Sequence, residues 1–204
     1  GDVFLASQPS GDADVRVFGR SRGFDATLQA GDDLWIGGGS NGPGGTAVLS
    51  VNQFGRVIVP DVLRIYAGGT LNIANFASVS AATVELGTLE VQGGTLNFST
   101  GSTQGELKFT GSTTLDANLI AAIGGASGTH NVGFITVADT LTLDDPLTID
   151  GGTLTVGFLV NHHQLTLTSG VFHLTQDDFN VSPGTTGPLF TVGTGATMIV
   201  NEQV

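Results

Sequence analysis

The sequence predicts an all-β fold built from stacked repeats, a β-solenoid, and three observations support this. Short runs alternate polar and apolar residues with a period of two, the pattern of a strand with one buried face. Glycine pairs separate these runs, and a Gly-Gly-Thr-Leu unit recurs at 68–71, 93–96 and 151–154. Such quasi-repeats are typical of solenoids, in which each unit buries its apolar face against the next.

The predicted strands follow one another along most of the chain. Each carries Leu, Ile, Phe or Val at alternate positions, with Thr, Asn, Glu or Lys between them. Because the runs are short and bounded by glycine, each is expected to be one strand of a repeat. These strands are 70–73, 95–98, 106–109, 140–143, 153–156 and 165–168.

Two segments depart from the repeat within a single predicted domain that spans residues 1–204. Residues 116–123 have the spacing of a helical turn that ends at Gly124-Gly125, so we interpret 116–138 as an insertion or a capping segment. Residues 1–27 are predicted to cap one end of the solenoid, because an open end would pair with other chains.

An antiparallel β-sandwich is the alternative fold. The stretch from Ile149 to Thr153 contains Asp-Gly-Gly between two alternating runs, which is also the pattern of a hairpin turn. The repeats favour the solenoid over this alternative.

Composition excludes several classes of function. The chain has 204 residues, 18 of them acidic and 6 basic, and its formal net charge is −12. No Lys or Arg follows Lys108. Nucleic acid is therefore not an expected partner, since phosphate binding needs clustered Lys and Arg. No apolar run approaches the roughly 18 residues of a membrane helix, so no membrane insertion by this chain is expected. The absence of cysteine excludes disulfides and Cys-ligated zinc.

Residues 13–98 carry a more specific pattern. Residues 31–37 read Gly-Asp-Asp-Leu-Trp-Ile-Gly, a loop rich in Gly, Ser and Asn follows at 38–45, and residues 68–73 read Gly-Gly-Thr-Leu-Asn-Ile. This pattern resembles the repeat of bacterial autotransporter passengers and related exported β-helix proteins. The resemblance implies a right-handed parallel β-helix, secreted or at the bacterial cell surface, that serves as a stalk or an adhesive surface. Its partner would be a host or cell-surface protein or a glycan.

Acidic doublets are the candidate metal ligands. Ca²⁺ takes carboxylate and carbonyl oxygens, which makes Asp144, Asp145, Asp177 and Asp178 candidate ligands, with Asp32-Asp33 as a third doublet. The loops lack the Gly-Gly-x-Gly-x-Asp repeat of calcium-binding β-rolls. The preferred interpretation of these acids is therefore solvated turns, and no cofactor is expected.

Two further functions are alternatives to a structural or adhesive role. A carbohydrate-active β-helix, a polysaccharide lyase or hydrolase, would need converging carboxylates. Asp144-Asp145 lacks the accompanying motifs, so the chain is not expected to be an enzyme. Ice or lattice binding would use a threonine ladder built from the evenly spaced Thr-Leu-Thr steps: Thr140, Thr142, Thr153, Thr155, Thr166 and Thr168.

Overall fold

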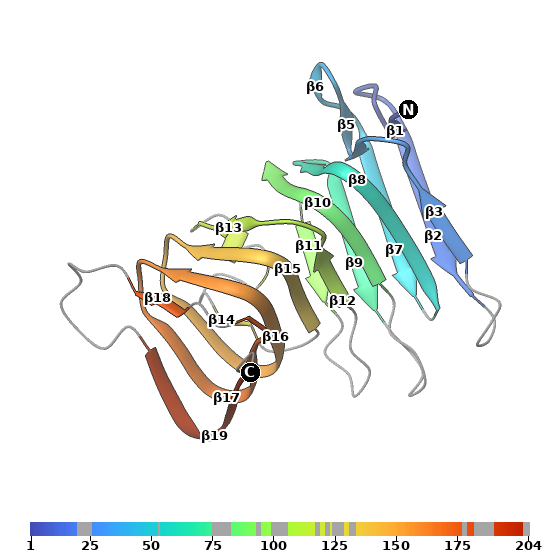
Figure 1. Cartoon of the computed structure of the whole chain (residues 1–204). Coiled ribbons are helices and arrows are strands. Elements are labelled where there is room, and N and C mark those ends of the chain that lie inside the picture. The colour runs from blue at the N-terminus through green and yellow to red at the C-terminus, as the bar shows by residue number, and fades with distance from the viewer. Residues whose placement is uncertain are drawn as a thin grey trace. The chain divides into compact units, whose positions relative to one another are not determined.

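The structure is a computed structural model, and its strands are mostly parallel (Figure 1). The chain forms two compact units, residues 1–108 and 109–204. No helix in the part of the chain described here is long and apolar enough to cross a membrane. The described residues are 1–19, 26–52, 54–74, 83–92, 95–98, 106–116, 119–120, 123, 129–130, 134–176, 179–181 and 190–201.

Unit 1 contains two main sheets, between which the chain alternates, and a small two-stranded hairpin (Figure 1). Within the two main sheets, the neighbouring strands whose register is defined are parallel. The first sheet has the order β1 (Val3–Leu5), β4 (Leu34–Ile36), β8 (Gly55–Tyr66), β10 (Thr83–Gln92) and β12 (Glu106–Phe109), and β3 (Ala26–Gln29) also pairs with β8. The second sheet has the order β2 (Asp12–Phe18), β7 (Thr46–Asn52), β9 (Gly69–Ala74) and β11 (Thr95–Phe98).

The core of unit 1 is made of aliphatic columns that run across the strands. Leu49 lies opposite Leu71, which lies opposite Leu96, and all three are buried. In the first sheet, Leu34 lies opposite Leu63, and neither is accessible to solvent. The period of two thus places like residues on one face, and parallel register stacks them.

The opposite face of the second sheet carries a column of amides and a hydroxyl. Asn72 lies between Ser50 and Asn97 in the register. The Asn72 amide donates to the Ser50 hydroxyl at 3.4 Å, and the Asn97 amide donates to Asn72 at 2.9 Å. The asparagines of the two Thr-Leu-Asn repeats therefore bond to each other across neighbouring strands.

Unit 2 repeats this parallel pairing with a shorter turn. Leu147 lies opposite Leu165, and Thr148 lies opposite Thr166. The long strands β15 (Phe134–Leu143), β16 (Leu147–Asn161), β17 (Leu165–Leu174) and β19 (Phe190–Val200) follow in that order. The short strands are β13 (Thr113–Leu115), which pairs with β15, and β14 (Thr129–His130) and β18 (Phe179–Val181), which pair with β16.

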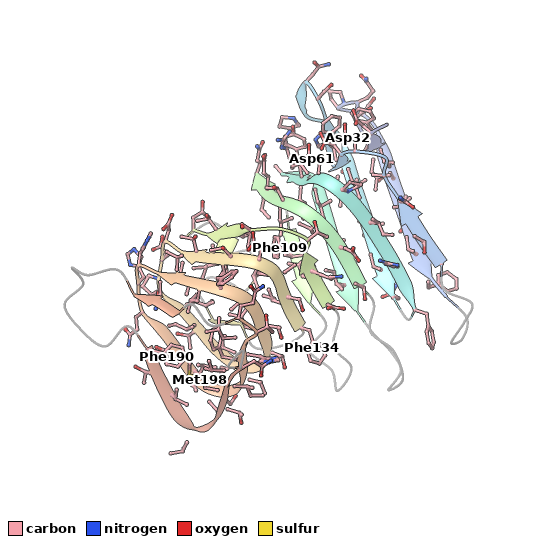
Figure 2. The ribbon with its side chains drawn as sticks, in the orientation of Figure 1. Asp32, Asp61, Phe109, Phe134, Phe190 and Met198 are labelled. Carbon is pink, nitrogen blue, oxygen red and sulfur yellow. The ribbon has the colours of Figure 1, made fainter. Side chains whose placement is uncertain are left out.

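The terminal strand β19 leaves apolar side chains exposed, among them Met198 (Figure 2). Met198 lies opposite the buried Phe172, and Val200 lies opposite the buried Leu174. Both continue inward-facing columns, but β19 ends the sheet and no further strand covers them in the described chain. This end of unit 2 is therefore an apolar strand edge.

The all-β prediction is confirmed, and the parallel strands are those that a β-helix requires. The antiparallel sandwich is not observed: among the described strand pairs whose register is defined, the one antiparallel pair is the short hairpin of β5 (Gly38–Gly39) and β6 (Gly42–Pro43). The hairpin considered at 149–153 is wrong, because this stretch lies inside β16 and pairs in parallel with β17. Gly151 and Gly152 have φ of 104° and 71°, so they bend the strand without reversing it.

The segment that begins at Asp116 contains the expected helical turn. The Asp116 carboxylate accepts a hydrogen bond from the Leu119 N–H at 2.9 Å, and its carbonyl accepts one from Ile120 at 2.9 Å. This is the N-cap geometry that aspartate favours. Leu119, Ile120 and Ile123 are buried. From Phe134 the chain is already in β15, so the last residues of the 116–138 segment form part of the sheet.

Candidate functional site

Three carboxylates meet at a corner of the first sheet of unit 1. Oxygen atoms of Asp32, Asp33 and Asp61 lie within 4.8 Å of one another, and Figure 2 labels two of these residues. Gln29 lies opposite Ile58 and Leu34 lies opposite Leu63. The segment between β3 and β4 is therefore matched by a segment of equal length inside β8, which places Asp61 beside Asp32.

The corner is held mainly by backbone hydrogen bonds. Asp33 Oδ1 accepts a hydrogen bond from the Val62 N–H at 3.0 Å, and the Asp33 carbonyl accepts one from Val3 at 2.9 Å. Asp33 is half-buried, while Asp32 and Asp61 are exposed. Carboxylates of this kind suit a hard cation, but Ca²⁺ takes six to eight oxygens. Exposed acids of this number are also common at solvated corners.

Among the described residues, the Asp144-Asp145 doublet does not form part of a cluster of three carboxylates. Asp144 and Asp145 lie at the corner between β15 and β16, where Asp144 Oδ1 is 2.9 Å from Nδ1 of His162. Both side chains of this pair are more than 40% exposed. In the described chain, the corner at Asp32 is the only place where three such metal-ligating groups meet. Asp177 and Asp178 lie outside the described residues.

The Thr-Leu-Thr steps do not stack on one another. Thr140 and Thr142 lie on β15, Thr153 and Thr155 on β16, and Thr166 and Thr168 on β17. The spacing of these steps in the sequence is shorter than one turn of unit 2, so Thr140 lies opposite Phe158 and Thr153 opposite Val171. A longer threonine column joins Thr129, Thr148, Thr166 and Thr191. Shorter pairs join Thr114 to Thr142 and Thr136 to Thr155.

Charged side chains link neighbouring turns of the first sheet. Arg56 Nη2 lies 2.7 Å from Glu85 Oε2, and Lys108 Nζ lies 3.6 Å from the same oxygen. The hydrogen bond from Arg56, helped by the charge of Lys108, holds the pKa of Glu85 below its usual value. Arg64 donates to Glu90 and lowers the pKa of that carboxyl in the same way.

A cavity of about 380 Å³ lies at the N-terminal side of unit 1. The loop after β1 forms one wall and the β5–β6 hairpin forms the other. Phe4 contributes the aromatic surface, and none of the lining side chains is charged. The lining consists of Phe4, Ser7, Gln8, Pro9 and residues 39–43.

Glycine is required in these walls because the backbones approach closely. A Cβ on Gly38 would lie 2.0 Å from the Tyr66 ring, and one on Gly45 would lie 1.9 Å from the carbonyl oxygen of Gly11. The Tyr66 hydroxyl donates to the Gly39 carbonyl at 3.1 Å. The loop rich in Gly, Ser and Asn noted in the sequence is thus the wall of a cavity.

The aromatic floor of the cavity is Phe4, whose ring packs on that of Trp35 in a tilted arrangement. The rings of Phe4 and Trp35 have centroids 4.4 Å apart and are tilted by 41°. Trp35 is buried, whereas 43% of Phe4 is exposed. Sequence reasoning missed Phe4 because no alternating run marks it as outward-facing.

Comparison with models of known protein families, with curated proteins and with solved structures found no match.

Proposed function

We propose that the chain is a right-handed parallel β-helix that serves as a rigid, non-enzymatic structural or adhesive module of a bacterial surface or secreted protein. The observation that carries this proposal is the parallel register of successive turns, in which like residues meet across the strands. The column Leu49–Leu71–Leu96 is one example.

Rigidity follows from how this register joins the turns. Each parallel pair contributes a backbone ladder, and each buried column contributes packing that a single turn could not have alone. Side chains add links between the same turns, as between Arg56 and Glu85. A module of this kind can hold an exposed surface at a fixed distance and orientation.

The net charge of −12 defines the partners that this surface suits. We propose a host or cell-surface protein or a glycan, because an acidic surface repels nucleic acid and anionic lipid. The carbohydrate-active alternative would rest on Asp144-Asp145, and Asp144 faces His162 there. The carboxylates that do converge are those of Asp32, Asp33 and Asp61, at the corner of unit 1. The ice-binding alternative would need the Thr-Leu-Thr steps to stack, and instead Thr140 lies opposite Phe158 and Thr153 opposite Val171.

Structural and functional measurements test the proposal. Hydrogen exchange should show slow amides throughout β7 to β10 and β15 to β17, and a crystal structure should show a right-handed coil. Beads coated with the full chain should attach to cells, whereas beads coated with the Leu63→Asp variant, which places a charge in the core, should not. Cleavage of a polysaccharide that is lost in Asp144→Ala and Asp145→Ala would overturn the non-enzymatic role.

A further inference from the structure

We propose that the cavity between the loop after β1 and the β5–β6 hairpin binds a neutral sugar, a hexose ring of a glycan. This inference goes beyond a general adhesive role by naming a site and a ligand class. It rests on the proposed function only in assuming that the surface is displayed, so the binding test below does not use cells.

The aromatic floor suits the apolar face of a sugar ring. Phe4 is 43% exposed, and its ring is supported from below by the buried Trp35 at 4.4 Å. A supported ring keeps its orientation, so a ligand that stacks on it does not have to order it first. The C–H groups on one face of a hexose have the partial positive charge that the face of an aromatic ring attracts.

The rim offers neutral hydrogen-bonding groups on both sides of this floor. Ser7 and Gln8 come from one wall, and Ser40 and Asn41 come from the other. All four are exposed. Amides and hydroxyls both donate and accept, which is what neighbouring sugar hydroxyls require. Because no lining residue is charged, the cavity has no counter-ion for a phosphate, a sulfate or a uronic acid.

The walls are fixed before any ligand arrives. The tight approach of Gly38 to Tyr66 holds the hairpin against the sheet, and the Tyr66 hydroxyl bonds to Gly39. Ala6 has a φ of 54°, and its carbonyl accepts a hydrogen bond from Gly45 at 2.9 Å. A non-glycine residue with a positive φ is strained, and such backbone strain is frequent at functional sites.

The volume also fits a small ligand. Small-molecule sites span about 300–1,000 Å³, and this cavity lies near the lower limit. A proline-rich peptide is the competing ligand, because Pro9 and Pro43 also line the cavity. Grooves for such peptides are lined by several aromatic rings. Here Phe4 is the single aromatic side chain in the lining, which favours the sugar.

The test is a titration of the full 204-residue chain with small probes. The probes are the methyl glycosides of glucose, galactose, mannose and N-acetylglucosamine, with glucuronic acid and a proline-rich decapeptide as competitors. We expect at least one neutral glycoside to bind and to shift the backbone NMR signals of residues 39–42. Absence of such shifts with all four glycosides would overturn the proposal, and so would tighter binding of glucuronic acid or of the peptide.

Matched variants locate the site. Phe4→Leu should weaken sugar binding about three- to tenfold, because it keeps apolar bulk and removes the aromatic face. Phe18→Leu is the control, since Phe18 is a similarly exposed phenylalanine on β2 that does not line the cavity. Asn41→Ala should weaken binding about two- to tenfold through lost hydrogen bonds, with Asn97→Ala as its control.

These variants also keep the test decisive. If Phe4→Leu fails to fold, the loop variants Gln8→Ala and Asn41→Ala still test the rim, because both side chains are exposed. Sugar binding that no cavity variant weakens would place the ligand elsewhere and overturn the proposal. Cell attachment without sugar binding would refute this site and leave the adhesive function standing.

Discussion

The two units pack the same kind of core but join their turns with different surface chemistry. Unit 1 uses ion pairs and amides, as in the contacts of Arg56 with Glu85 and of Asn97 with Asn72. Unit 2 has no Lys or Arg and uses hydroxyls and a histidine instead. Ser169 donates to Asp150 at 2.9 Å, and Nδ1 of His162 lies 2.9 Å from Asp144. The inward-facing columns of side chains therefore define the fold, while the outward-facing columns are free to vary.

The units also differ in the length of their turns. One turn of unit 2 runs from Leu147 to Leu165, and it is shorter than the turn of unit 1 that runs from Leu34 to Leu63. The extra residues of the longer turn include the β5–β6 hairpin that walls the cavity. A long turn thus leaves room for a binding surface that a short turn does not provide.

Removal of residues 1–27 is expected to have the largest effect. This change removes β1 and β2, which are the end strands of the two sheets, and uncovers the fully buried Leu34 and Leu49. Open strand edges pair with other chains. Light scattering should therefore show association of the truncated chain at concentrations where the full chain scatters less. A truncated chain that scatters no more than the full chain would show that these strands do not protect the edge.

Truncations of core side chains are expected to have the next largest effect, and each should destabilise mainly the unit that contains it. Phe172→Ala removes a ring with no solvent exposure that packs 5.7 Å from Phe190, and should cost about 3–5 kcal/mol. Leu63→Ala in unit 1 should cost about 2–5 kcal/mol. Urea unfolding monitored by hydrogen exchange should assign each loss to its own unit. Equal losses in both units from either variant would mean that they unfold together.

A smaller effect is expected from added methyl groups. Gly45→Ala should destabilise unit 1 by about 1–3 kcal/mol, because its Cβ would lie 1.9 Å from the Gly11 carbonyl oxygen. Gly111→Ala in unit 2 is the control, since nothing lies within 4 Å of its Cβ position. Thermal melts should show a lower melting temperature for Gly45→Ala. Gly111→Ala should leave the free energy of unfolding unchanged or raise it by about 0.4–1 kcal/mol. Equal melting temperatures for the two variants would contradict the close approach at Gly45.

The smallest effect is a pH dependence specific to unit 1. The folded pKa values of Glu85 and Glu90 are lowered, chiefly by hydrogen bonds from Arg56 and Arg64. Their stabilisation is therefore present above the unfolded value of 4.5 and is lost as pH falls through the lower folded pKa values. We expect about 0.2–1 kcal/mol for each partly exposed pair.

Unfolding measured between pH 3 and 6 checks this dependence, with Glu90→Gln as the comparison. The variant should lose part of the acid-sensitive slope, and added salt should reduce the slope of the parent chain. A variant with the same slope as the parent would show that the Arg64–Glu90 pair does not contribute.

Sequence reasoning predicts the inward face well because that face depends only on local alternation. The leucines of the three Gly-Gly-Thr-Leu units, Leu71, Leu96 and Leu154, are all buried. The same reasoning does not show which side chains meet between strands, because that depends on the length of each turn. Asp61 joins Asp32 through a corner of matched length, and Asp144 meets His162 one turn further along the chain.

The regular spacing of β16 and β17 has a consequence for the gene. Leu147-Thr148-Ile149 lies opposite Leu165-Thr166-Leu167, so the two stretches are interchangeable in the core. Unequal recombination between such stretches would remove or duplicate one whole turn and leave every inward residue facing inward. A chain with one such stretch deleted or repeated is therefore expected to keep the alternation of inward and outward residues in unit 2.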